Sequence, residues 1–266
     1  MDSRKSREVA VKAALKAGAY IKERVKETKH IGYKGAFNIV TDVDKASEGM
    51  ILEILRAEFP DDSILAEESG VSDKSGKRRW LVDPLDGTTN FAHSYPFFAV
   101  SIGLEQDGEV IAGVVYNPIS GELFRAEKGQ GAFLNDEPIH VSSLSTLDES
   151  LLATGFPPDT ANIMQNNLEA FSTLTNMCHG VRRDGSAALD LCYVASGRLD
   201  GFWERKLAPW DIAAGSLIVS EAGGRVTNLE NGKLDLSTGH ILATNGKVHD
   251  QVVGVLADIG RTLTKR

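Results

Sequence analysis

The chain has 266 residues, of which 42% are hydrophobic, so it can bury a core large enough for one large domain or two closely packed halves. Its net charge of -8 and its sequence pI near 5.3 argue against general nucleic-acid binding, because proteins that bind nucleic acid are usually basic. An acidic chain can still act on small phosphorylated substrates when metal ions neutralise the charge.

The cellular setting is indicated by what the sequence lacks. Cys178 and Cys192 are too far apart for a CxxC motif, a pattern typical of buried thiols in a reducing compartment. The first twenty residues lack the apolar core of a secretion signal, and no apolar run approaches the ~20 residues of a membrane helix. We therefore expect a soluble cytoplasmic protein that has no membrane partner.

The N-terminal region predicts two helices followed by two strands. Apolar residues at helical spacing predict an amphipathic helix over about 5–27, with Gly18 on its apolar stripe. The stretch "HIGYKGAFNIVT" is expected to be a short connection, and a second helix is expected over about 44–59, where Pro60 stops it. The segments "SILAEES" and "RRWLVD" each predict a short strand that ends in acidic residues.

The middle of the chain predicts antiparallel strands. "FFAVSIGLE", "EVIAGVVYN" and "ELFRAE" are separated by the turn signals Asp107-Gly108 and Ser120-Gly121, which is the pattern of a meander. "GQGAFLNDEPIHV" is expected to continue this region in short extended pieces.

After about residue 147 the predicted strands and helices alternate. Strands are expected at "ESLLATGF", "LDGFWE" and "HILATN", and helices at 160–178, "SAALDLCYVASG", "PWDIAAGSLIVSEAGG" and 247–264. No flexible linker separates the two regions. We therefore expect a layered α/β protein whose halves, 1–145 and 146–266, pack closely as one catalytic unit, with an antiparallel sheet from the first half.

Acidic residues recur at the ends of apolar segments: Glu67, Glu68, Asp83, Asp86 and Asp211. Strand ends are where sites gather in layered α/β proteins, and an oxygen-rich set suits Mg²⁺. The six histidines are scattered without the spacing of a zinc site. Taken alone, Asp211 is best explained as a helix cap and Asp86-Gly87 as a turn, but the conjunction of all these acids in one chain favours a metal site.

The stretch Gly87-Thr88-Thr89 follows Asp86 at an expected helix start, where free backbone N–H groups attract phosphate and a threonine hydroxyl can orient a water. A similar Asp-x-Asp-Gly-Thr loop occurs in haloacid-dehalogenase-type phosphatases. Here the acids are one residue further apart, Pro84 lies between them, and the loop is a third of the way along the chain. A nucleophilic aspartate of that type is therefore disfavoured.

Three segments together resemble the inositol monophosphatase family. "WLVDPLDGTTNFAH" resembles its first signature, "PWDIAAGSLIVSEAGG" its second, and "ILAEES" the glutamate segment that precedes them. They occur in the family's order, and the similarity extends over nearly the whole chain. The resemblance implies the five-layered αβαβα sandwich shared with fructose-1,6-bisphosphatase. It also implies Mg²⁺-dependent hydrolysis of phosphomonoesters by an activated water, without a phosphoenzyme.

The resemblance also implies a role for individual residues. Metal ligands would be Glu67, Asp83, the carbonyl of Leu85, Asp86 and Asp211, with Asp83 shared between ions in a site for two or three Mg²⁺. The catalytic group would be Glu67, Thr88 and Asp44, which orient and activate the water. The phosphate and the substrate would contact Gly87, Thr88, Gly185, Ser186, Ala187, Glu204 and Asp211. Without the resemblance, Glu204 could equally be a surface acid at a strand end.

Some assignments stay open at this point. The loop "GYKGAFNIVT" departs from the animal pattern, so the role of Lys34 is open. Asp42 competes with Asp44 for one role, although the spacing from the preceding threonine favours Asp44. Arg205 and Lys206 are either solvated surface residues or a clamp for a second phosphate.

The default substrate implied by the family is inositol 1-phosphate, with fructose 1,6-bisphosphate and histidinol phosphate as alternatives. Nucleotide bisphosphatases usually read Asp-Gly-Thr-Lys-Glu where this chain reads "DGTTNF", which argues against them. A hypothesis of another class is a binding protein in a transcription or RNA-processing assembly. The family further implies a homodimer and inhibition by lithium and calcium.

Overall fold

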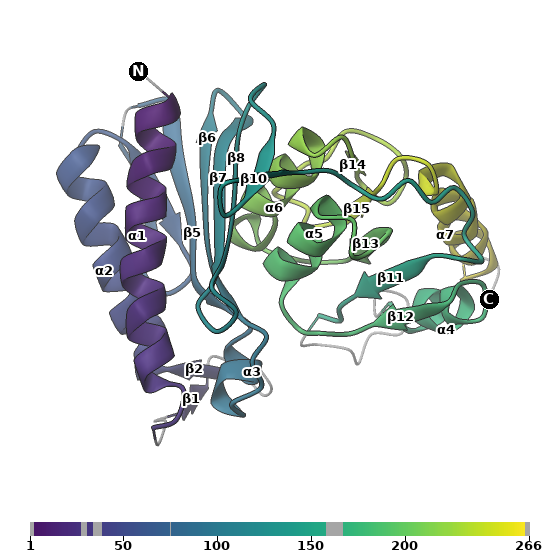
Figure 1. Ribbon diagram of the computed structural model, residues 1–266, viewed down its shortest axis with the longest axis horizontal. Coiled ribbons are helices and arrows are strands. Elements are labelled where there is room, and N and C mark those ends of the chain that lie inside the picture. The colour runs from purple at the N-terminus through teal and green to yellow at the C-terminus, as the bar shows by residue number, and fades with distance from the viewer. Residues whose placement is uncertain (1–2, 28–30, 34–38, 75, 158–166, 264–266) are drawn as a thin grey trace.

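The computed structural model describes residues 3–27, 31–33, 39–74, 76–157 and 167–263, and their elements stack in five layers (Figure 1). A larger sheet and a smaller sheet alternate with three helical layers, so the predicted αβαβα sandwich is confirmed. The helical layers are, in order, α1 (Ser3–Arg24) with α2 (Asp42–Glu58), α5 (Ala187–Ala195) with α6 (Pro209–Glu221), and α4 (Leu168–Thr175) with α7 (His249–Leu263).

The larger sheet has eight strands among the described residues, in the order β10-β9-β8-β7-β6-β5-β3-β4. Their bounds are β3 Ser63–Ala66, β4 Gly70–Ser72, β5 Arg78–Asp86, β6 Ala99–Gln106, β7 Glu109–Asn117, β8 Glu122–Glu127, β9 Ala132–Leu134 and β10 Glu137–Ile139. The predicted meander is confirmed as β6, β7 and β8. Among the described strands of this sheet, only β3 and β5 pair in parallel. Because they run in the same direction, the acids that follow Ala66 and Val82 lie at the same end of the two strands.

The smaller sheet has the order β12-β11-β13-β15-β14 within the described ranges. Its strands are β11 Leu151–Thr154, β12 Gly180–Arg182, β13 Gly201–Glu204, β14 Arg225–Thr227 and β15 Ile241–Thr244. The strand expected at "HILATN" is β15, and all four of its residues are buried. The helix expected at 160–178 is the shorter α4, while 158–166 lie outside the described residues.

Small residues set how closely the helices approach the larger sheet. A Cβ at Gly18 would lie 2.5 Å from the ring of Tyr116, so α1 packs there only because this position has no side chain. On the opposite face, a Cβ at Gly113 would lie 2.8 Å from the carbonyl oxygen of Ala214. The absence of that side chain lets α6 lie directly on β7, which places the N-terminus of α6 beside the acidic edge of the sheet.

The start of α2 differs from the expected residue because Thr41 caps the helix. The Val43 N–H donates to Thr41 Oγ1 at 3.2 Å, and the Thr41 N–H donates to Asp44 Oδ2 at 2.8 Å. This reciprocal pair is a capping box, so the helix begins at Asp42 and Asp44 lies in its first turn.

The segment expected to be a connection contains a small hairpin, β1 (Ile31–Tyr33) and β2 (Ile39–Thr41), which pair in antiparallel fashion. All three residues of β1 are exposed, so no buried alternation marks it in the sequence. Lys34 lies outside the described residues. The short helix α3 (Thr88–Ala92) packs against β2 and begins where the glycine-threonine stretch predicted a helix.

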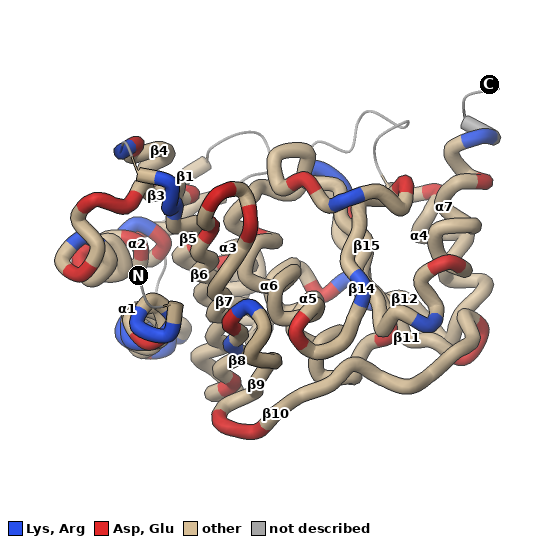
Figure 2. The backbone as a smooth tube through the Cα atoms, turned by 90° about the horizontal axis from the view of Figure 1, so that it is seen from above, with Lys and Arg blue, Asp and Glu red and all other residues tan. Residues whose placement is uncertain are grey.

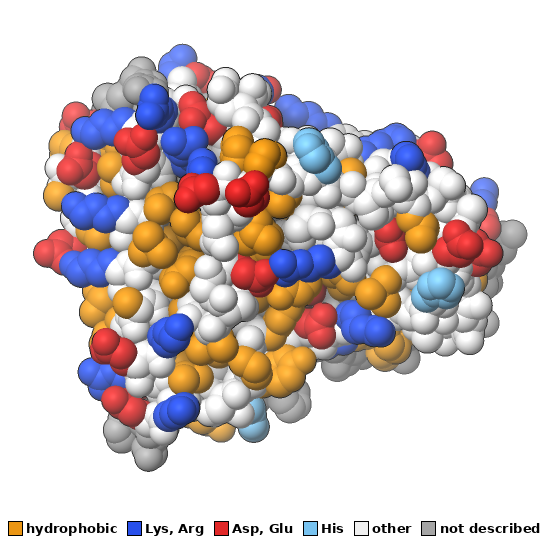
Figure 3. All heavy atoms as spheres, viewed as in Figure 1, with side chains coloured by type: hydrophobic (Ala, Val, Ile, Leu, Met, Phe, Trp, Pro, Cys, Tyr) orange, Lys and Arg blue, Asp and Glu red, His pale blue; other side chains and the backbone are white. Residues whose placement is uncertain are grey.

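The surface charge agrees with the overall acidity. Figure 2 shows acidic and basic residues interspersed along the chain, and on the face in Figure 3 the described Lys and Arg side chains form no continuous stripe. No helix in the described ranges is long and apolar enough to cross a membrane. Both cysteines are free; Cys192 is buried as expected, but Cys178 is only half-buried.

Candidate active site

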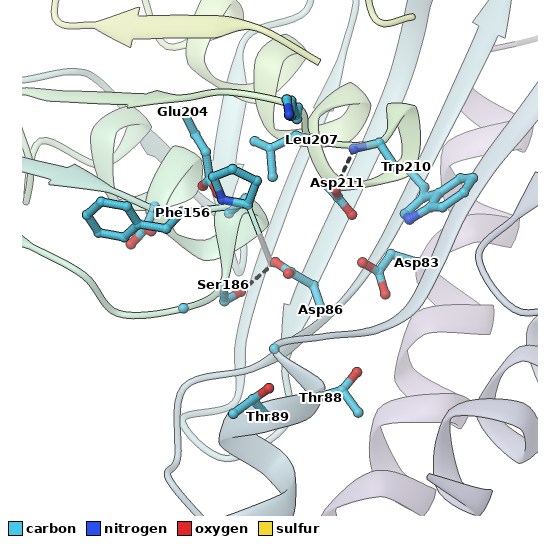
Figure 4. A pocket seen from close by; sticks show the side chains of 18 of the residues that line it. Asp83, Asp86, Thr88, Thr89, Phe156, Ser186, Glu204, Leu207, Trp210 and Asp211 are labelled. Atoms are coloured by element: carbon cyan, nitrogen blue, oxygen red, sulfur yellow. Dashed lines mark hydrogen bonds between the residues drawn. The ribbon is translucent and has the colours of Figure 1, made fainter. Parts of the chain in front are cut away.

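A pocket of about 330 Å³ opens between the edge of the larger sheet, α3 and the N-termini of α5 and α6 (Figure 4). It is lined by the predicted site residues Glu67, Asp83, Leu85, Asp86, Gly87, Thr88, Gly185, Ser186, Ala187, Glu204 and Asp211. These residues extend from position 67 to position 211, so the fold brings together residues that are far apart in the sequence. Asp44 is the one predicted residue that does not line the pocket, and it lies behind Thr88.

Glu67 and Asp83 lie side by side because of strand register. Ala66 pairs with Val82 in the parallel β3–β5 pair, and the Glu67 N–H donates to the Val82 carbonyl oxygen at 3.1 Å. The next residue of each strand is an acid, and both acids emerge at the same end of the sheet. The two carboxylates therefore face one space rather than opposite sides.

A bulge explains why Asp83 and Asp86 both line the pocket. In a regular strand, residues three apart point to opposite faces. Here Asp83 pairs with Ser101 but Asp86 pairs with Ala99, so β5 uses three steps where β6 uses two. The extra residue turns the second carboxylate to the side of the first. The Leu85 N–H donates to Asp83 Oδ1 at 2.9 Å and holds the first carboxylate in place.

Asp86 is held by the second half of the chain. Its Oδ2 accepts hydrogen bonds from Ser186 Oγ at 2.6 Å and from the Ala188 N–H at 2.7 Å, at the start of α5 (Figure 4). Gly87 next to it has a φ of 94°, and a Cβ there would lie 3.2 Å from the Gly185 carbonyl oxygen. A glycine at this position is therefore required both by the backbone conformation and by the close approach of the two loops.

Asp211 caps a helix and also lines the pocket. It is the third residue of α6, and its Oδ2 accepts the Ala208 N–H at 2.7 Å, as a capping acid does. In Figure 4 the same side chain points toward Asp83 and Asp86. The cap thus fixes the orientation of a carboxylate that lines the pocket.

Thr88 and Asp44 form a hydrogen-bonded pair at the pocket wall. Thr88 Oγ1 donates to Asp44 Oδ1 at 2.7 Å, while Asp44 Oδ2 accepts from the backbone N–H of Thr41 at 2.8 Å and from its hydroxyl at 2.5 Å. Asp44 is fully buried, whereas Asp42 is exposed. The geometry therefore agrees with the assignment of Asp44 rather than Asp42 as the partner of Thr88.

The carboxylates in the pocket repel one another. Burial, and then the charges of Glu67, Asp86 and Asp211, raise the pKa of Asp83 well above its ordinary value. Burial likewise raises the pKa of Asp86 to about 6 and that of Asp211 to about 8. Without a cation among them, three neighbouring carboxylates could not all stay ionised near neutral pH.

The donor set fits a hard divalent cation. No three acidic, histidine or cysteine side chains in the described ranges converge tightly enough to hold an ion by themselves. Carboxylate and carbonyl oxygens are the ligands that hard divalent cations such as Mg²⁺ and Ca²⁺ prefer. The pocket offers oxygen ligands of this kind from Glu67, Asp83, Asp86, Asp211 and the Leu85 carbonyl, so the residues present fit a hard divalent cation.

The far wall of the pocket holds two more buried acids. Glu204 ends β13, and burial, followed by the charge of Asp211, raises its pKa to about 8. Asp190 in α5 was not singled out from the sequence. It is 1% exposed, its Oδ1 has no hydrogen-bond partner among the described residues, and burial raises its pKa well above the ordinary value. The available signal was an acid inside the apolar run "AALDLCYVA".

Cations occupy the rim of the pocket. Arg205 is half-buried and Lys206 is exposed, and both line the pocket, as does Arg183, which the sequence reasoning missed. Burial lowers the pKa of Arg205. These side chains bring positive charge into the pocket, and the charge of Arg183 acts on Glu204.

Comparison with known proteins shows which family has this fold and this set of pocket residues. The model of the inositol monophosphatase family matches residues 2–261. The chain belongs to the inositol monophosphatase family. An inositol-1-monophosphatase of Synechocystis sp. is 52% identical over 94% of this chain and 88% of its own length. The inositol monophosphatase structure from Anabaena (Nostoc) sp. superposes with a TM-score of 0.89, at 47% identity over 96% of each chain.

Other relatives in this comparison are named as Nus factors rather than as phosphatases. The Nus factor SuhB of Escherichia coli strain K12 is 43% identical over 94% of this chain and 95% of its own length. The inositol monophosphatase family is a family of metal-dependent phosphatases that act on small phosphorylated compounds, and this chain is a phosphatase of that family.

Proposed function

We propose that the protein is a Mg²⁺-dependent phosphomonoesterase that hydrolyses inositol 1-phosphate to inositol and phosphate. The observation that supports this most strongly is the bulge in β5, which turns Asp83 and Asp86 to one side, facing Asp211.

The residues proposed to hold Mg²⁺ are Glu67, Asp83, the carbonyl of Leu85, Asp86 and Asp211, for two or three ions. Bound Mg²⁺ would neutralise these carboxylates, polarise the phosphoryl group and lower the pKa of water. Ser186 and the N–H of Ala188 hold Asp86 with its remaining oxygen toward the pocket, so the ligand is oriented before binding.

Thr88, Asp44 and Glu67 are the proposed catalytic residues. Because the Thr88 hydroxyl donates its proton to Asp44, its oxygen is left to accept a hydrogen bond from a water. Glu67, half-buried at the same wall, would accept the second hydrogen bond of that water. Together these residues would fix the direction from which the water attacks phosphorus.

The substrate would lie between the two halves of the chain. Gly87 and Thr88 are proposed to bind the phosphate through backbone N–H groups, with Gly185, Ser186 and Ala187 across the pocket. Glu204 and Asp211 would accept hydrogen bonds from hydroxyl groups of the polyol. The inositol assignment is supported by the name of the Synechocystis relative, which is an inositol-1-monophosphatase.

The rim cations favour one alternative substrate. Arg183, Arg205 and Lys206 line the pocket, and the charge of Arg183 acts on Glu204, so a second phosphate of fructose 1,6-bisphosphate could bind beside these cations. A dual inositol monophosphatase and fructose-1,6-bisphosphatase is therefore the second candidate.

Phosphate release in the presence of Mg²⁺ tests the proposal. Inositol 1-phosphate, fructose 1,6-bisphosphate and histidinol phosphate would be compared in parallel, with the Asp83→Asn protein as the blank. We expect the highest kcat/KM with inositol 1-phosphate. Comparable turnover of the bisphosphate would establish the dual enzyme, and no release from any of the three would refute the proposed activity.

A role in a transcription or RNA-processing assembly is the candidate of another class, and the name Nus factor SuhB of its relatives favours it. Affinity capture with the wild-type and Asp83→Asn proteins separates the two roles. Partner proteins that remain bound to the inactive variant would show a binding role. If neither the wild-type protein nor the variant captures a partner, catalysis stays the proposed function.

We further propose a cytoplasmic homodimer that lithium inhibits. Light scattering coupled to size exclusion measures the oligomeric state against the monomer mass of 28.7 kDa. A lithium titration of phosphate release measures the inhibition, and a rate that lithium leaves unchanged would contradict that part of the proposal.

A further inference from the structure

We infer that Gly155 is a specificity-determining position of this site. Because Gly155 has no side chain, it leaves the space in which the Glu204 carboxylate lies, and it thereby fixes where that carboxylate meets substrate hydroxyls. The inference rests on the proposed function, since it concerns how the pocket recognises the polyol part of the substrate.

The register of the smaller sheet brings the two residues together. β11 and β13 pair in parallel, with Thr154 opposite Trp203. The next residue of each strand, Gly155 and Glu204, therefore emerges at the same end of the sheet, and both line the pocket. Glu204 is 7% exposed, and Figure 4 shows it on the same wall as Phe156, the neighbour of Gly155.

The space for the carboxylate exists only with glycine at this position. A Cβ built on Gly155 would lie 2.2 Å from Glu204 Oε2 and 2.4 Å from both Oε1 and Cδ. Its φ is outside the left-handed region, so the backbone itself would accept alanine. The need for glycine here therefore comes from the position of Glu204 and not from backbone conformation.

A buried hydrogen-bond network prevents the backbone from moving away. Asn167 Nδ2 donates to the Gly155 carbonyl oxygen at 2.8 Å and to Thr154 Oγ1 at 2.6 Å. Asn167 Oδ1 accepts from Trp203 Nε1 at 2.7 Å, and Thr154 Oγ1 donates to the Trp203 carbonyl oxygen at 2.5 Å. This network clamps the ends of both strands, so a methyl group at position 155 must displace the Glu204 side chain.

The carboxylate kept in this position is available to a ligand. The Glu204 side chain is buried at the wall of the pocket, and among the described residues its pKa is shifted by burial and by neighbouring charges rather than by a hydrogen bond. A carboxylate at this wall suits a hydroxyl of a polyol or sugar phosphate as its hydrogen-bond donor. For a substrate that has no hydroxyl groups, the KM should not depend on where the Glu204 carboxylate lies.

The test compares Gly155→Ala with wild type on two substrates, inositol 1-phosphate and p-nitrophenyl phosphate, which has no hydroxyl groups. We expect the KM for inositol 1-phosphate to rise about tenfold, the size expected for a lost hydrogen bond to a charged group, with the aryl phosphate changed less than about twofold. Calorimetric titration with myo-inositol gives the same comparison without turnover. Gly254→Ala is the matched control, because a Cβ there meets nothing within 4 Å.

A double-mutant cycle separates steric displacement of Glu204 from a general structural effect. In a Glu204→Ala background the overlapping atoms are gone, so Gly155→Ala should add no further loss. An unchanged KM for inositol 1-phosphate in Gly155→Ala, or an equal loss in both backgrounds, would overturn the inference. If Gly155→Ala fails to fold, the double variant Gly155→Ala/Glu204→Ala decides the question. A folded double variant would show that the overlap with the Glu204 carboxylate caused the failure. An unfolded double variant would overturn the inference. A wild-type protein inactive on both phosphates would instead refute the proposed function.

Discussion

Individual residues in the pocket owe their positions to local geometry that differs from the regular pattern. The spacing of Asp83 and Asp86 predicted that both belong to one site, but a regular strand would have separated them. The bulge that brings them together arises from pairing with β6, which no local pattern in "WLVDPLDG" reveals. Asp190 and Gly155 were missed for a related reason, since their roles depend on neighbours far along the chain.

The pair formed by Thr88 and Asp44 gives a prediction at this scale. Thr88→Val removes the hydroxyl and with it the hydrogen bond to Asp44, so kcat should fall by about 10²-fold or more while KM changes little. Steady-state kinetics with inositol 1-phosphate measures both constants. Thr175→Val, at an exposed position of α4, is the control, and a Thr88→Val protein as active as this control would exclude the role of Thr88.

Helices and long strands were the elements that sequence patterns predicted best. The apolar stripes of α1 and α2 are long enough to show their period, and the turn signals Asp107-Gly108 and Ser120-Gly121 separate the long strands β6, β7 and β8. The strands β4, β12 and β14 have three residues each, too few for a period, and they exist because a neighbouring strand offers hydrogen bonds. The sequence pattern placed the start of α2 at about residue 44, and the hydrogen bonds of the cap at Thr41 show that the helix begins at Asp42.

The strand β5 carries a buried ion pair whose loss should destabilise the protein. Arg78 Nε lies 3.1 Å from Asp62 Oδ2, and their side chains are 10% and 9% exposed. Asp62→Ala would leave the buried guanidinium uncompensated, so we expect a loss of about 3–5 kcal/mol in the free energy of unfolding. Urea denaturation measures it. The control Glu53→Ala breaks an exposed ion pair with Lys16 and should cost less than about 1 kcal/mol; equal losses would contradict the account.

The helix α7 begins at a buried histidine that should make stability depend on pH. His249 contacts Thr227 Oγ1 through Nε2 at 3.0 Å and Thr244 Oγ1 through Nδ1 at 2.9 Å, and burial lowers its pKa from 6.5 to about 4. Between these values the unfolded chain binds a proton that the folded chain does not. Stability from this group is therefore complete above pH 6.5 and is lost as the pH falls toward 4.

The variant His249→Gln tests this dependence. Carboxylates titrate in both proteins, so the informative quantity is the difference between the two stability curves. The free energy of unfolding, measured by urea denaturation from pH 7 to pH 4, should fall more steeply for wild type than for the variant. Parallel curves would show that His249 does not contribute.

At the scale of the whole molecule, the site exists only where the layers meet. The larger sheet supplies Glu67, Asp83 and Asp86, and the central helices supply Ser186 and Asp211. The division into halves at residue 145 stays a proposal, favoured by the separate stretches of chain that form the two sheets. The layered architecture was predictable because the family resemblance extended over nearly the whole chain, whereas alternation of strands and helices alone indicated only a layered α/β protein.

The most direct test of the central claim is a Mg²⁺ titration of phosphate release from inositol 1-phosphate by the wild-type and Asp83→Asn proteins. We predict a wild-type rate that rises with Mg²⁺ and disappears with a chelator. We also predict an Asp83→Asn rate at least about a hundredfold lower at every Mg²⁺ concentration, because the Asp83 carboxylate is the ligand that the proposed metal ions would share. Substantial Mg²⁺-dependent turnover by Asp83→Asn, or wild-type turnover that chelation leaves unchanged, would contradict the account.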